Sequence, residues 1–183
     1  QIVTGTPPYA AVRQLEIGAT LVQDETLRSS ATGRAQILFV DETTMSIAPN
    51  TTILLNSAVF DPDGTGTTRL QMLEGALRFI GGRNSRNTPA EIRTRTALIG
   101  IRGSSALIAI LNGRTIAIFL AGEELCITPA ERQRYCTSRQ GGVLNEEGYQ
   151  GRVSPEFLVQ LLQAIDGEPG AAAPASQTTR LEA

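Results

Sequence analysis

The sequence of 183 residues contains no histidine, no lysine and no tryptophan, and all 16 of its basic residues are arginine. Histidine is the commonest general base near neutral pH and the commonest metal ligand, so its absence removes the usual basis of hydrolytic and zinc chemistry. Aromatic residues make up only 4% of the chain, so we expect a core of Ile, Leu, Val and Ala. The composition favours a protein that is not an enzyme and holds no cofactor.

The sequence also lacks an excess of positive charge and any long apolar run. The formal net charge is −2, whereas a nucleic-acid-binding domain shows a basic surface. No stretch reaches the roughly 18 apolar residues that a membrane helix requires. We therefore expect neither nucleic acid as a partner nor a membrane span. The chain begins at Gln1 without Met, which predicts an exported mature protein, periplasmic or extracellular, whose signal peptide has been removed.

Only two cysteines occur, Cys126 and Cys136. Cys126 ends an apolar run and Cys136 follows a polar connector, so two strands joined by this connector can bring the Cα atoms within disulfide range. In an oxidising compartment such a bridge stabilises a protein by about 2–3 kcal/mol. Two buried free thiols are the alternative interpretation. A cysteine pair without histidine is a poor metal site.

The centre of the chain is an apolar stretch over residues 94–111, which is followed by Asn112-Gly113 and a second apolar run over residues 114–120. The Asn-Gly dipeptide favours a type I′ turn, because both residues tolerate positive φ and the turn matches the twist of the strands. Glycines at 100 and 103 interrupt the first run. Within these stretches, residues 106–111 and 115–120 are short runs that are apolar on both alternating faces, so we expect them to form a hairpin covered on both sides.

The rest of the chain up to residue 152 shows many short strand patterns of about 5–7 residues, separated by turn signals at irregular spacing. Clear examples cover residues 34–40 and 52–60, and residues 70–80 carry two short apolar runs separated by Glu74-Gly75. This pattern predicts an all-β domain over residues 12–152, either a sandwich or a solenoid.

Both ends of the chain differ from this domain. Residues 1–11 contain Pro7-Pro8 and predict an extended arm. Residues 153–167 predict a helix that begins with the N-cap Ser154 and ends at Gly167. One face of the helix is apolar, so we expect it to cap an open end or edge of the β domain, with a partner-binding helix as the alternative; this face comprises Phe157, Leu158, Leu161, Leu162 and Ile165. Residues 168–183 form an Ala- and Pro-rich tail.

Two further patterns are weak candidates for binding. The sequence Asp61-x-Asp63-Gly64 resembles the start of a calcium loop, but Met72 stands where the bidentate Glu of an EF-hand belongs. Asx-type turns explain the same residues. A local group of arginines is suited to an anionic partner, although pairing with Asp and Glu across strands is the commoner role; it comprises Arg83, Arg86, Arg93, Arg95 and Arg102.

The central stretch Thr94-x-Thr-Ala-x-Ile-Gly-Ile-Arg-Gly-Ser resembles the motif of the FecR-like domain family, with Arg95 in place of the usual Pro and Ser104 in place of the usual Thr. Further agreement in family order lies within residues 33–41, 45–51, 59–62 and 74–82. The resemblance implies a β-solenoid-like coil of short strands, ranked above the sandwich, and assigns no catalytic residue. It implies a structural role for the motif positions Thr94, Thr96, Ile99, Gly100, Ile101, Arg102 and Gly103.

The best-known members of this family are envelope regulators with a cytoplasmic segment, one membrane span and this domain outside. The present sequence corresponds to the outer part. We expect a self-assembling structural subunit, such as a filament, in which arm, helix and tail join copies of the chain; the expected contact positions are Pro7, Pro8, Tyr9, Phe157, Leu161 and Pro174. The alternative is a sensory or adaptor domain that binds another envelope protein or a small ligand.

Overall fold

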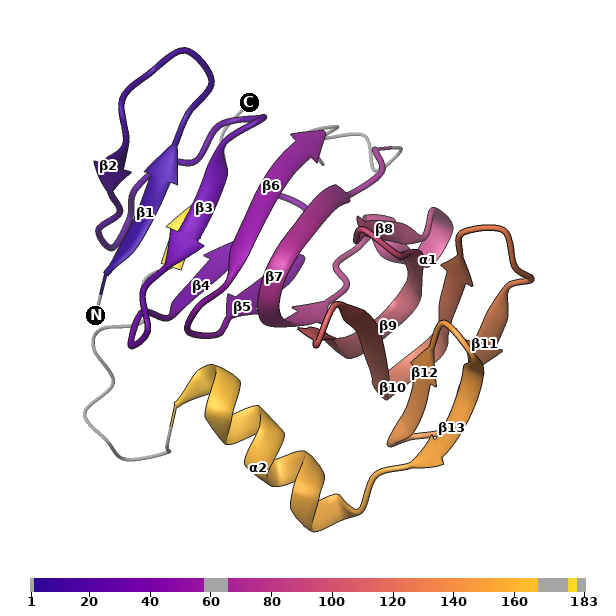
Figure 1. The fold of residues 1–183 in the computed structure, drawn as a ribbon. Coiled ribbons are helices and arrows are strands. Elements are labelled where there is room, and N and C mark those ends of the chain that lie inside the picture. Colours follow the sequence, from indigo (N-terminus) through magenta and orange to yellow (C-terminus); the bar gives the residue numbers. More distant parts are fainter. Residues whose placement is uncertain (1, 58–65, 168–177, 181–183) are drawn as a thin grey trace.

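A computed structural model describes residues 2–57, 66–167 and 178–180, which form one open β-sheet and two helices (Figure 1). Among these residues only the pairs β7–β8 and β14–β4 are parallel, and the other pairs are antiparallel. The elements are β1 (Val3–Thr6), β2 (Arg13–Gln14), β3 (Thr26–Ser29), β4 (Ala35–Leu38), β5 (Thr44–Ile47), β6 (Thr52–Ser57), β7 (Arg69–Ile80), α1 (Asn84–Asn87), β8 (Ala90–Arg93), β9 (Ala97–Leu111), β10 (Arg114–Pro129), β11 (Tyr135–Thr137), β12 (Gly142–Asn145), β13 (Gly148–Arg152), α2 (Pro155–Asp166) and β14 (Thr178–Arg180).

The predicted all-β class with a C-terminal helix is confirmed. The sheet runs from β13 through β12, β10, β9, β8, β7, β6, β3 and β1 to β2, with β4, β5, β11 and β14 as branches. It is a single open sheet, whose order does not close on itself. The choice between a coil and a sandwich stays a prediction. Neither helix in the described part of the chain is long and apolar enough to cross a membrane.

The centre of the fold is the β9–β10 hairpin, as the sequence predicts. Asn112 and Gly113 take φ values of 52° and 76°, and Leu111 stands opposite Arg114 across the turn. Positive φ at both central positions is the requirement of a type I′ turn. Both strands are longer than the predicted runs at 106–111 and 115–120: β9 extends from Ala97 to Leu111 through both glycines of the central motif, and β10 extends from Arg114 to Pro129.

The two faces of this hairpin belong to different apolar clusters. Ala106 and Phe119 are paired across the strands and point into the main core, which lies inside the curved sheet. The next pair, Leu107 and Ile118, belongs to a second cluster that contains Ile165 of α2. Side chains of neighbouring residues in a strand point to opposite faces, so a strand that is apolar at every position requires a cover on both sides. The helix supplies the second cover.

α2 therefore packs on a face of the sheet, and not over an end or edge as the sequence suggested. The hydroxyl of Ser154 accepts a hydrogen bond from the Phe157 N–H at 3.2 Å and caps the helix N-terminus. Near the C-terminus of the helix, Arg34 donates to the Ala164 carbonyl at 3.2 Å. Arg78 of β7 forms an ion pair of 2.7 Å with Asp166. These contacts and the apolar cluster fix the helix along the outer face of β5, β7, β9 and β10 (Figure 1).

The segments expected to be a free arm and a free tail both pair with strands of their own chain. β1 lies between β2 and β3, with Val3 buried in the core. β14 runs parallel to β4. An unpaired strand edge exposes main-chain donors and acceptors, and pairing within the chain satisfies them.

Two connections also differ from their sequence-based prediction. Residues 69–80 form the single strand β7, in which Gly75 adopts a φ of 92° beside Thr51. A glycine can take this conformation without breaking the strand, which a larger residue cannot. The polar connection after β7 contains the short helix α1. The candidate calcium loop at residues 61–64 lies outside the described residues.

Candidate functional site

The two threonines of the central motif lie in a hydrogen-bond network at the start of the hairpin. The Thr94 hydroxyl accepts from the Ala97 N–H at 3.0 Å, and its oxygen lies 2.7 Å from the Thr115 hydroxyl. The Thr115 hydroxyl lies 2.8 Å from that of Thr96. Thr96 in turn donates to the carboxylate of Glu146 at 2.6 Å. The network joins the start of β9 to β10 and to the turn after β12, so its members act as structural links.

Glu146 is the charged member of this network. Its Oε1 also accepts from the Thr115 N–H at 2.6 Å. Partial burial opposes ionisation, but the hydrogen bonds from Thr96 and Thr115 and the positive charge of Arg114 outweigh it and lower the pKa of Glu146 below its usual value. A hydrogen-bonded carboxylate with a lowered pKa is a structural acceptor near neutral pH and a poor proton donor.

The second half of the motif lies in β9, where Gly103 is the one position with a positive φ. Ile99 and Ile101 are fully buried in the main core, and Gly100 between them stands opposite Cys126. Gly103 adopts a φ of 51°, and the exposed Arg102 forms an ion pair with Glu123 at 3.5 Å. Next to Gly103, the buried Ser104 hydroxyl donates to carbonyl oxygens and accepts from the Glu124 N–H at 2.9 Å.

The two cysteines form a disulfide between β10 and β11. Cys126 and Cys136 stand directly opposite each other, with a Cα–Cα distance of 4.1 Å. Cys126 is buried, whereas Cys136 is exposed. β11 pairs with β10 alone, so the disulfide fastens a three-residue strand to the sheet. The register explains the bridge, because directly opposed residues of antiparallel strands include the closest Cα pairs in a sheet.

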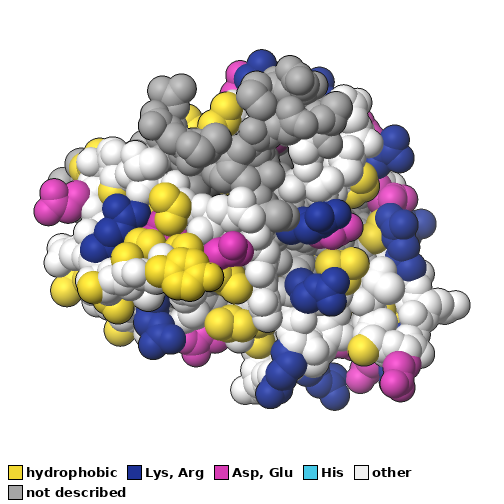
Figure 2. Space-filling view, turned by 90° about the horizontal axis from the view of Figure 1, so that it is seen from above, with side chains coloured by type: hydrophobic (Ala, Val, Ile, Leu, Met, Phe, Trp, Pro, Cys, Tyr) yellow, Lys and Arg dark blue, Asp and Glu magenta, His cyan; other side chains and the backbone are white. Residues whose placement is uncertain are grey.

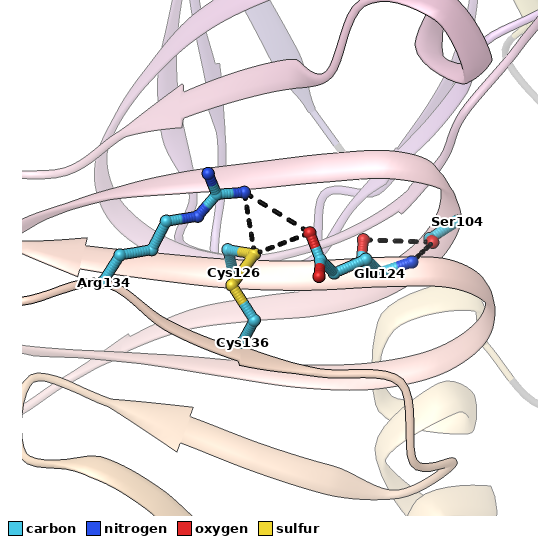
Figure 3. The surroundings of a disulfide bond; sticks show 5 residues. All are labelled: Ser104, Glu124, Cys126, Arg134 and Cys136. Atoms are coloured by element: carbon cyan, nitrogen blue, oxygen red, sulfur yellow. Dashed lines mark hydrogen bonds and ion pairs between the residues drawn. A yellow bond between two sulfur atoms is a disulfide. The ribbon is translucent and has the colours of Figure 1, made fainter.

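Two charged side chains lie beside the buried sulfur (Figure 3). Nη2 of Arg134 is 3.0 Å from Sγ of Cys126 and 3.4 Å from Oε2 of Glu124. The same Oε2 is 3.2 Å from the sulfur. A disulfide sulfur carries no proton, so this last contact is not a hydrogen bond donated by Cys126. Glu124, Cys126 and Cys136 hold their potential ligand atoms within 4.8 Å of one another, but metal binding by cysteine requires free thiolates, which the disulfide consumes.

The positions predicted to contact partners lie in different places. Tyr9 is fully exposed with a φ of 63°, in the turn after β1 that also contains Pro7 and Pro8. On α2, Phe157 is 48% exposed at the N-terminal end, while Leu161 packs against the sheet in the second cluster. The structure does not bring these residues together. Pro174 lies outside the described residues.

Two of the five arginines that the sequence groups together are paired with glutamates. Arg83 is paired with Glu42 at 3.4 Å and Arg102 with Glu123. On the face seen in Figure 2, arginines alternate with acidic side chains, and apolar side chains gather beside them. The two ion pairs favour the structural interpretation of Arg83 and Arg102 over an anion-binding role.

Three structural links join residues whose pairing the sequence does not predict. They are the carboxylate of Glu146 in the threonine network, the Arg78–Asp166 pair and the β4–β14 pairing. Each joins residues that are far apart along the chain, so neither periodicity nor local motifs point to it. Only Arg78 carries a hint, as a charged residue among the apolar positions of a predicted strand.

Comparison with known proteins connects this architecture to one family. The family model described as FecR protein matches residues 25–123, from just before β3 into β10. A comparison with curated proteins finds no match.

Among solved structures, two crystal structures at 2.50 and 1.65 Å resolution of a Parabacteroides distasonis protein described as an anti-sigma factor are similar to this chain. Both give a TM-score of 0.59 at 14% sequence identity and cover 74% of this chain. The chain spans 63% and 64% of those proteins, less than two thirds of their length. At this identity the similarity establishes the fold alone.

Proposed function

Because the chain belongs to the FecR protein family, we propose that it is a regulatory or sensory module that acts by binding another protein of the bacterial cell envelope. The family match carries this proposal, since it covers residues 25–123 and therefore most of the sheet. The similarity in fold to a protein described as an anti-sigma factor supports a regulatory role over a structural one.

The disulfide supports a location outside the cytoplasm. Reducing systems keep cytoplasmic cysteines as thiols in most bacteria, whereas disulfides persist in the periplasm and outside the cell. The only two cysteines of the chain are joined, Cys126 to Cys136. We therefore place the working module in an oxidising compartment, the periplasm or the cell surface.

A role without catalysis is part of the proposal. The polar residues of the family motif are engaged in holding the hairpin, with Thr94 and Thr96 bonded to Thr115 and Glu146. Ser104 follows a glycine, a position that catalytic serines can occupy. Its hydroxyl is instead hydrogen-bonded to main-chain groups of Arg102 and Glu124. Histidine is absent from the whole chain. These features favour recognition of a protein surface over chemistry on a substrate.

A self-assembling structural subunit is the less well supported alternative. It relied on a free arm and a free tail that exchange between copies, but β1 and β14 both pair with strands of their own chain. Light scattering over a dilution series tests it directly. Polymers or rings that survive dilution would favour assembly, whereas a monomer over the whole series supports the regulatory module.

Site-specific photo-cross-linking in the native host tests the proposed function. A cross-linking amino acid at Tyr9, Leu111 or Phe157 samples three exposed positions that lie in different elements, and the same substitution at buried Phe79 is the control. We expect one of the exposed positions to yield an adduct with an envelope protein, and deletion of the gene to change transcription of a small set of genes. Unchanged transcription together with no adduct from any exposed position would contradict the proposal.

A further inference from the structure

Strand β4 has a neighbour on both sides because the C-terminal strand β14 pairs with it. β4 pairs on one side with β5, where Ala35–Leu38 run antiparallel to Thr44–Ile47. On its other side it pairs with β14, with Thr179 opposite Ile37 and Arg180 opposite Leu38. Without β14 this side of β4 would be an edge of the sheet.

β4 is held in place independently of β14. Ile37 is 1% exposed in the main core, and β5 continues the sheet to β7. β14, in contrast, contributes three residues in a parallel pair. Parallel pairing is slightly less stable per residue than antiparallel pairing, and so short a strand forms few main-chain hydrogen bonds. Separation of β14 would leave a preformed row of donors and acceptors on β4.

A row of partly exposed side chains, two apolar and one threonine, begins at this edge. Leu38 stands opposite Thr44, and Thr44 stands opposite Ile80, so the three lie in one row on the same face of the sheet. Leu38 is 37% exposed and Ile80 is 38% exposed. The residue of β14 at the end of this row is Arg180. An apolar residue at that register position would extend the row and remove more apolar surface from water.

We propose that the β4 edge is a strand-acceptor site, closed within the chain by β14 and opened for an extended segment of the partner protein. The incoming segment runs parallel to β4, contains no proline where it pairs, and carries an apolar residue opposite Leu38. Main-chain hydrogen bonds supply the binding and the apolar position supplies selectivity. This inference rests on the proposed function, because it names the surface through which the module binds its partner.

A second copy of this chain fits the edge less well than such a partner. The tail of another copy has the same sequence as the chain's own tail, so it offers no different residue at the register position opposite Leu38. The chain's own tail is also covalently attached, which gives it a high effective concentration at the edge. A different segment with an apolar residue has the advantage needed to replace it.

Two full-length variants test the closure by β14. Thr178→Pro combined with Thr179→Pro removes two consecutive main-chain donors, so at least one hydrogen bond of any β14 register is lost. Thr178→Ala combined with Thr179→Ala keeps both donors and is the matched control. We expect the β4 amides that point away from β5 to exchange with deuterium faster in the proline variant than in the alanine variant. Equal melting temperatures would show that both variants keep the folded core.

The binding probe is a fluorescein-labelled peptide of residues 176–183 with leucine in place of Arg180. A competing tail that closes the edge about 90% of the time weakens binding of the probe about tenfold. We therefore expect the probe to bind the proline variant about tenfold more tightly than the alanine variant, and the peptide that keeps Arg180 to bind more weakly. A probe peptide with proline at both positions 178 and 179 should not bind either variant.

Three results would overturn the proposal. The first is equal binding of the leucine probe to both variants, and the second is unchanged exchange of the β4 amides. The third is a wild-type dimer that the proline variant loses, because it would assign the edge to a second copy. If cross-linking identifies an envelope partner but the probe does not bind, the proposed function stands and this surface is wrong. If the probe binds but no envelope partner and no transcriptional effect are found, the strand-acceptor site stands and the proposed function is wrong.

Discussion

Leu107 and Ile118 stand opposite each other in the β9–β10 hairpin and are 4% and 7% exposed because α2 covers them. The helix reaches them through Ile165, its one buried residue. The central strands of this sheet are apolar on both faces, so the helix is part of the β domain's core and not an appendage to it.

Replacement of Ile165 by alanine should therefore destabilise the whole protein. Removal of a large buried aliphatic side chain costs about 2–5 kcal/mol, and the position near the helix end favours the lower half of this range. Urea denaturation followed by circular dichroism measures the change. Val159→Ala is the matched control, because Val159 lies on the same helix and is 52% exposed. Equal effects of the two substitutions would contradict the packing of α2 on this face.

Loss of the disulfide should lower stability only under oxidising conditions. The bridge closes a loop with a sequence separation of 10, for which loop-closure entropy gives about 2–3 kcal/mol. We expect Cys136→Ser to lower the melting temperature in air and to match the wild type under strong reductant. Mass spectrometry of the alkylated native protein tests whether the bridge forms, since two free thiols would show that it does not.

Substitution by alanine should destabilise the protein strongly at Gly75 and only slightly at Gly100. Gly75 has a φ of 92°, and a Cβ there would overlap Thr51, including its main chain. We expect a loss of roughly 2–4 kcal/mol. Gly100 has no atom within 4 Å of a Cβ and lies in extended backbone, so Gly100→Ala should change stability by less than about 1 kcal/mol. Comparable losses at both positions in urea denaturation would contradict this assignment.

The hydrogen bonds of Glu146 predict a pH-dependent contribution to stability. Its pKa is lower in the folded protein than the usual 4.5 of the unfolded chain, so its stabilisation is present above pH 4.5 and is lost as pH falls through the folded pKa. Glu146→Ala should cost roughly 1 kcal/mol at pH 7, a figure reduced for partial exposure, and the difference from wild type should shrink below pH 4.5.

Glu146→Gln separates charge from hydrogen bonding at this position. Both short contacts of the carboxylate go to Oε1, which a glutamine can supply. We expect Glu146→Gln to keep most of the stability at pH 7 while its difference from Glu146→Ala no longer depends on pH. Thermal denaturation at pH 3.5, 5 and 7 measures both effects. A glutamine variant as unstable as the alanine variant would mean that charge, and not the acceptor, carries the contribution.

The sequence by itself determined the features whose physics is local. Asn112-Gly113 sets the hairpin turn because both residues accept positive φ, and Ser154 with the apolar spacing after it sets the helix. The disulfide was also foreseeable, because Cys126 and Cys136 flank a short polar connector between two strand patterns. In each case the residues that decide the structure lie close together along the chain.

Only the tertiary structure decided which distant segments meet. The position of α2 on a face of the sheet, the link from Thr96 to Glu146 and the pairing of β14 with β4 each join residues 50 to more than 100 positions apart. An apolar helix face or an extended tail can satisfy its local preferences against many surfaces, so its own sequence does not select one. The selection comes from an apolar face of the sheet and an edge of β4, and neither exists before the sheet has formed.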